Sequence, residues 1–160
     1  HIGSLNVGRT TTEINSTGGA ALLRVNQTKN VTYLGTIAKD VMLVKEGDSK
    51  LGFSATFSCT NVTVRAGTLE LSGTAKLPDA ATVTLAGDGV LTLPPDTTDV
   101  VEKLYYVDAE SGETRPAPRG LYSATSVPEG LPEGFAAHFA GGALRVRKSD
   151  LPTGIVILVR

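Results

Sequence analysis

Short segments in which apolar and polar residues alternate recur along this chain, separated by turns rich in Gly, Asp and Ser. A Gly-x-Leu-x-(Val/Leu) pattern occurs at Gly3–Val7, Gly67–Leu71, Gly89–Leu93 and Gly142–Val146. This alternation places Leu and Val on one face and polar residues on the other, as a half-buried strand requires. Each segment is therefore predicted to be a β-strand.

The stretch from Val44 to Leu93 consists of such segments, and its two halves resemble each other. Val62–Leu71 is matched by Val83–Leu93 at a spacing of about twenty residues, which is typical of architectures built from stacked coils. Aromatic residues make up only 5% of the chain and Trp is absent, so the interior must be built from small aliphatic side chains. Such side chains suit narrow, regular layers. The pattern predicts an all-β solenoid.

The character of the chain changes after these repeats. Pro94 and Pro95 cannot donate hydrogen bonds to a strand ladder, so they are predicted to break the repeat. An open solenoid end exposes apolar surface and strand edges, so a cap is expected beyond this point. We expect a single domain with solenoid repeats over residues 1–95 and an irregular β cap over residues 96–160. Further strands are expected within the cap, at Val101–Asp108 and Ile155–Val159.

Val44–Ser54 followed by Asn61–Leu71 resembles the autotransporter-associated β-strand repeat. In that family a turn and strand containing Lys, Gly and Leu is followed by Val-x-Ala-Gly-Thr-Leu, which is present here as Val64–Leu69. The first half departs from the family pattern at Ser49-Lys50 and at Gly52-Phe53. The resemblance implies a right-handed parallel β-helix, in which this chain is the C-terminal part of a longer bacterial secreted or surface protein. The family has no shared catalytic residues.

Composition and motifs count against several classes of function. The net charge is −1 and the most basic run is Arg145-Val146-Arg147-Lys148, so nucleic acid is not an expected partner. No apolar stretch is long enough to span a bilayer, so no membrane insertion is expected. The acidic residues occur singly at turns, and His138 is expected to pack in the cap. We therefore expect no metal, no cofactor and no catalytic activity.

Glycan binding remains as the favoured function. Sugar rings stack on Tyr, and their hydroxyl groups bond to Arg, so the irregular last third supplies the candidates. Neighbours on a strand point in opposite directions, so the alternative is that one of the adjacent tyrosines plugs the core while the other faces solvent. The glycan-binding candidates are Tyr105, Tyr106, Arg115, Arg119 and Tyr122.

The sequence thus predicts a non-catalytic, extracellular or cell-surface module of a larger bacterial protein that binds polysaccharide. Two alternatives stay open: a purely structural spacer or stalk, and a terminal accessory piece of a carbohydrate-active enzyme. Clustering of Tyr and Arg on one exposed face would favour binding. Burial of the tyrosines would favour the spacer.

Overall fold

A computed structural model describes Leu5 and residues 12–151 of the chain. The predicted strand at Ile155–Val159, and all of Gly3–Val7 except Leu5, lie outside the described residues. The described part contains one short 3-10 helix, η1 (Phe135–His138), and no α-helix. Its strands are β1 (Glu13–Ile14), β2 (Ala21–Asn26), β3 (Val31–Tyr33), β4 (Thr36–Ile37), β5 (Val41–Glu46), β6 (Leu51–Phe53), β7 (Asn61–Val64), β8 (Thr68–Leu71), β9 (Thr82–Leu85), β10 (Val90–Val101), β11 (Lys103–Val107), β12 (Thr114–Pro116), β13 (Gly120–Tyr122) and β14 (Phe139–Val146).

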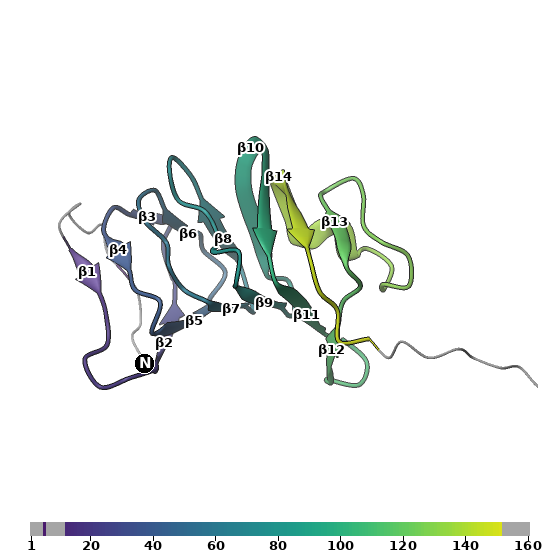
Figure 1. The fold of residues 1–160 in the computed structure, drawn as a ribbon, viewed down its shortest axis with the longest axis horizontal. Coiled ribbons are helices and arrows are strands. Elements are labelled where there is room, and N and C mark those ends of the chain that lie inside the picture. Colours follow the sequence, from purple (N-terminus) through teal and green to yellow (C-terminus); the bar gives the residue numbers. More distant parts are fainter. Residues whose placement is uncertain (1–4, 6–11, 152–160) are drawn as a thin grey trace, which may run out of the picture.

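The strands form two long sheets that run along the length of the molecule (Figure 1). One sheet has the order β13-β14-β10-β8-β6-β3, the other β12-β11-β9-β7-β5-β2, and β1 pairs with β4 in a small third sheet. Successive coils pair in parallel, and hydrogen bonds between them join residues about twenty positions apart, such as Lys50 N to Asn30 Oδ1 at 2.8 Å. The predicted β-solenoid and its period are confirmed, with about 4 turns.

The interior consists of columns of like side chains stacked from coil to coil. Leu51, Leu69 and Leu91 are in register on neighbouring parallel strands, and each is fully buried. On the facing sheet Val62 pairs with Val83 in the same manner. Because side chains alternate along a strand, every second residue enters the interior, and the twenty-residue repeat places the same kind of side chain there in each coil. This is why small aliphatic residues suffice for the core.

The structure differs from the sequence prediction at Pro94 and Pro95, which do not end the strand. Strand β10 continues through Pro94 and Pro95 to Val101, so the predicted strand from Val101 begins later, with β11. The ladder between β10 and β14 is interrupted, as proline requires, by a register shift between Leu93 and Thr98. A local turn accommodates the extra residues, and in it the Thr97 hydroxyl donates to the Pro94 carbonyl at 2.6 Å. The prolines thus produce a bulge within one strand rather than ending it.

The C-terminal end of the stack is closed by two antiparallel edge strands and an aromatic cluster. Strand β12 pairs antiparallel with β11, and β13 pairs antiparallel with β14, so both parallel sheets end in hairpin-like pairs. Phe135 of η1 lies at the centre of the cluster, with ring centroids 5.4 Å from Tyr106 and 6.2 Å from Tyr122. His138, expected to pack in the cap, contacts Phe135, and its Nδ1–H donates to the Gly89 carbonyl at 2.7 Å. The cap is thereby joined to the last coils.

Tyr122 shows what this closure contributes to stability. Its side chain is fully buried, and its hydroxyl donates to the Pro118 carbonyl at 2.5 Å, while burial raises its pKa above the ordinary value of 10.0. We expect Tyr122→Phe to lower the free energy of unfolding by about 1 kcal/mol, because the Pro118 carbonyl loses its donor while the ring packing is kept. Urea unfolding followed by circular dichroism measures this loss. Tyr105→Phe, at a more exposed position, is the control, and an equal effect of both variants would contradict the assignment.

Candidate functional site

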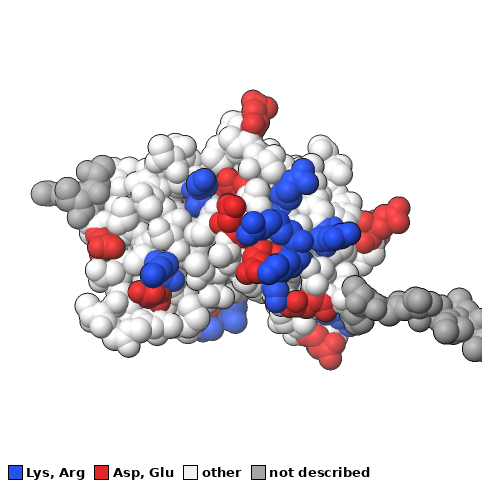
Figure 2. Space-filling view, in the orientation of Figure 1, with Lys and Arg blue, Asp and Glu red and all other residues white. Residues whose placement is uncertain are grey.

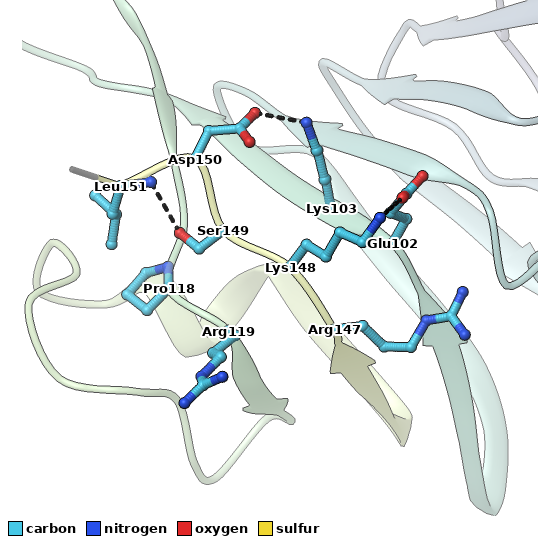
Figure 3. A pocket seen from close by; sticks show the side chains of 9 residues that line it. All are labelled: Glu102, Lys103, Pro118, Arg119, Arg147, Lys148, Ser149, Asp150 and Leu151. Carbon is cyan, nitrogen blue, oxygen red and sulfur yellow. Dashed lines mark hydrogen bonds and ion pairs between the residues drawn. The ribbon is translucent and has the colours of Figure 1, made fainter. Parts of the chain in front are cut away.

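A groove crosses the surface at the C-terminal end of the solenoid, where β11, the segment between β12 and β13, and the residues after β14 meet (Figure 3). Its volume is about 740 Å³, within the range of ligand sites in proteins. We call it the C-terminal groove. Its lining residues are Glu102, Lys103, Pro118, Arg119, Arg147, Lys148, Ser149, Asp150 and Leu151.

Two ion pairs join residues that line the C-terminal groove. Lys148 Nζ lies 2.5 Å from Glu102 Oε1, and Lys103 Nζ lies 2.8 Å from Asp150 Oδ2 (Figure 3). Strand register explains the first pair, since the Lys148 amide donates to the Glu102 carbonyl and brings the two residues side by side. The Tyr105 hydroxyl also donates to Asp150. Both lysines of the groove are therefore neutralised by a carboxylate.

The titration behaviour of these groups follows from the same contacts. The hydrogen bond from Lys148 lowers the pKa of Glu102, and the hydrogen bond from Lys103 lowers the pKa of Asp150. The hydrogen bond to Asp150 in turn raises the pKa of Lys103 and that of Tyr105. These shifts keep all four groups in their ordinary charge states at neutral pH, with Glu102 and Asp150 as anions, Lys103 as a cation and Tyr105 as a neutral phenol.

A second, smaller depression of about 380 Å³ adjoins the groove on the outer face of β14. It is lined by Arg119, Gly120, Arg145, Val146 and Arg147, and it shares two arginines with the groove. Figure 2 shows lysine and arginine side chains gathered over this end of the molecule, with acidic side chains beside them. The two depressions together form one continuous polar surface.

Burial removes two of the five predicted glycan contacts. Tyr122 is fully buried and Tyr106 retains 9% of its exposure, and both pack in the aromatic cluster. The prediction that all five residues share a glycan-binding surface is wrong for these two, because a ring that faces the core cannot stack on a sugar. The alternative of one plugging tyrosine and one outward tyrosine is confirmed, with Tyr106 inward and Tyr105 outward.

The other three candidates separate into two places. Arg119 lines the groove, and Tyr105 borders it through its bond to Asp150. Arg115 instead lies on β12 and pairs with Asp108 at 3.4 Å and Glu113 at 3.7 Å, within the β11–β12 hairpin. Arg115 does not line the groove.

Sequence reasoning missed most of the groove. Arg147 and Lys148 line the groove, and Arg145 lines the adjoining depression, but in the sequence this basic run indicates only that the chain lacks an extended basic stretch for nucleic acid. Its alternation did carry a signal, since two arginines separated by one valine on a strand must share the outer face. The pairing of Lys103 with Asp150 joins residues 47 positions apart and leaves no local sequence signature.

No family model, curated protein or solved structure matches this chain. The resemblance to the autotransporter-associated repeat stays a prediction. Within Leu5 and residues 12–151, no cluster of His, Cys, Asp and Glu is arranged to hold a metal ion. No helix in this part of the chain is long and apolar enough to cross a membrane.

Proposed function

We propose that this protein is a non-catalytic, extracellular β-solenoid module of a larger bacterial protein, and that it binds polysaccharide in the C-terminal groove. The observation that carries the proposal is the groove itself, an open surface in which Arg, Lys, Glu, Asp and Ser side chains stand side by side. Sugars present many hydroxyl groups, each of which donates and accepts, so a mixed row of donors and acceptors suits them. An open groove also accommodates a long chain ligand at any point along it.

The elements that form the groove support this proposal. Its residues come from the start of β11, the segment before β13 and the segment that follows β14, whose first two residues are joined to the sheet by backbone hydrogen bonds to Val101 and Glu102. Binding groups fixed on rigid elements lose little conformational entropy when a ligand binds. Arg119 is the one predicted glycan contact that lines the groove, and the hydroxyl of Tyr105 contacts its wall.

A structural spacer is the second candidate. It is favoured by the burial of Tyr106 and Tyr122, which leaves no aromatic platform lining the groove. The continuous parallel ladders from β2 to β11 would make such a spacer stiff. The two functions are compatible in one molecule, and a direct binding test distinguishes a spacer alone from a spacer with a glycan site.

Affinity gel electrophoresis against a panel of neutral and acidic polysaccharides tests the proposal. We expect at least one polysaccharide class to retard the protein, and Arg119→Ala to restore most of the mobility. Arg65→Ala is the matched control. The Arg65 side chain is 49% exposed, and Arg65 directly follows β7 and does not line the groove. An absence of retardation by every polysaccharide would leave the spacer as the function of this module.

A further inference from the structure

The smaller depression beside the C-terminal groove is lined by three arginines, which could bind an anionic group. Arg119, Arg145 and Arg147 together line the smaller depression, and all three are exposed. Arg145 and Arg147 are two residues apart on and just beyond β14, so both leave the sheet on its outer face. Arg119 reaches the same depression from the segment before β13, which pairs with β14. Three arginines therefore border one concave surface, although the side chains of Arg119 and Arg147 extend in different directions (Figure 3).

The charge in this depression is only partly balanced. Arg147 donates to the Asp79 carbonyl at 2.8 Å and lies 3.9 Å from the Asp79 carboxylate. Arg119 and Arg145 form no ion pair with any residue in the described part of the chain. The lysines next to them are occupied by Glu102 and Asp150. Among the described residues, two exposed guanidinium groups are thus left without a carboxylate partner.

From this arrangement we infer that the polysaccharide is acidic, and that Arg119 and Arg145 bind its carboxylate or sulfate groups. The inference rests on the proposed function and specifies its ligand class. A guanidinium donates two parallel hydrogen bonds to a carboxylate or a sulfate, a geometry that a neutral hydroxyl does not match. An anionic group bound in the depression is also attracted by the positive charges that border it.

The neighbouring groove favours a polysaccharide over a nucleic acid. Glu102 and Asp150 pair with the two lysines, so the surface lacks the unbroken row of free positive charges that a continuous phosphate backbone favours. The same carboxylates accept hydrogen bonds from sugar hydroxyl groups. Bases of single-stranded nucleic acid stack on aromatic side chains, and the groove lining contains none. The surface therefore suits isolated negative charges separated by hydroxyl groups, as in a uronic acid polymer or a sulfated glycan.

The test compares polygalacturonate, dextran sulfate, neutral dextran and a single-stranded DNA oligonucleotide as ligands of the intact chain, using affinity electrophoresis and titration at 50 mM and 500 mM NaCl. We expect retention by polygalacturonate or dextran sulfate that weakens at the higher salt concentration. Arg145→Gln should weaken this binding about 10-fold, because one charge-assisted pair is lost. Arg145→Lys should lie between the native protein and Arg145→Gln, since the charge is kept and the two-pronged geometry is lost. Arg65→Gln should change it less than about twofold, as expected for a surface charge away from the site.

The outcomes separate the inference from the proposed function. Retention by neutral dextran that is equal to retention by the acidic polymers would overturn the acidic ligand class and leave polysaccharide binding intact. Binding to DNA tighter than to both acidic polysaccharides would overturn the ligand class as well. An equal loss in Arg145→Gln and Arg65→Gln would show that net charge, and not this depression, is responsible. Lack of binding to any polymer would remove both proposals.

Discussion

Replacing Gly67 by Ala is expected to lower the free energy of unfolding by about 3 kcal/mol. Gly67 has a φ of +60°, and a Cβ built at this position would lie 2.5 Å from the Gly47 carbonyl oxygen and 2.6 Å from the carbonyl carbon of Asp48. Those atoms are backbone of the preceding coil, so they cannot turn aside as a side chain does. The corner of one coil rests directly on the corner of the next, and only glycine allows this approach.

Gly112→Ala is the matched control for this effect. Gly112 has a similar φ of +70°, but nothing lies within 4 Å of the Cβ that would be added. This variant should cost only the strain of the left-handed backbone, about 1 kcal/mol. Chemical unfolding of both variants gives the comparison. Equal losses would show that the coils are not stacked as closely as described.

Lys45→Met is expected to lower the free energy of unfolding by about 2 kcal/mol at pH 7. Lys45 is fully buried on β5, in register between Val25 and Val64 of the neighbouring coils. Its ammonium group donates to the carbonyls of Glu46 at 3.0 Å, Gly47 at 2.6 Å and Ala66 at 2.9 Å. Methionine fills a similar space but leaves these three acceptors without their donor. The result would show that the hydrogen bonds of a buried lysine to backbone carbonyls of two neighbouring coils stabilise the solenoid.

The pH dependence of the free energy of unfolding, compared between the native protein and Lys45→Met, gives a second test. Burial lowers the pKa of Lys45 from 10.5 to about 8, although Asp48 and Asp88 act in the opposite direction. Between these two values the unfolded chain holds a proton that the folded chain has released, so the native protein gains stability as the pH rises through this window. The difference in stability between native protein and Lys45→Met should therefore be larger at pH 10 than at pH 7.

Lys39→Met is the control for both measurements, because Lys39 is exposed in a turn. It should change the free energy of unfolding by less than about 0.5 kcal/mol at either pH. A loss in Lys39→Met that matches Lys45→Met, or a Lys45→Met difference that shrinks at pH 10, would contradict the role given to Lys45.

The fold could be predicted from the sequence because a solenoid repeats its signal. One strand begins in each of the Gly-x-Leu-x-Leu segments at Gly67–Leu71 and Gly89–Leu93, and parallel pairing brings Leu69 against Leu91. The prediction failed at Pro94 and Pro95, where a bulge keeps both halves of β10 in one sheet. Proline has a local effect on hydrogen bonding, but whether a strand continues beyond it depends on the partner strand, which local sequence does not reveal.

The candidate site could be predicted only in part. Residue type indicates tyrosine and arginine as glycan-binding candidates, but whether each one can bind depends on the direction of its side chain. Tyr105 and Tyr106 face opposite sides of β11, and Tyr122 faces the core from β13. The groove is formed where residues near position 103 meet residues near position 150. Contacts between residues so far apart in the sequence arise from coil stacking and capping, so no local motif predicts them.

The central claim is that the surface around Arg119, Arg145 and the C-terminal groove is where this protein binds a polysaccharide. An NMR titration of the isotope-labelled protein with oligogalacturonate tests it most directly, because each backbone amide reports its own surroundings. The account predicts shift changes at residues 102–103, 118–121 and 145–151, with the strands from β2 to β7 unchanged. Shift changes spread over the outer faces of β2, β5 and β7, or none at saturating oligosaccharide, would contradict it.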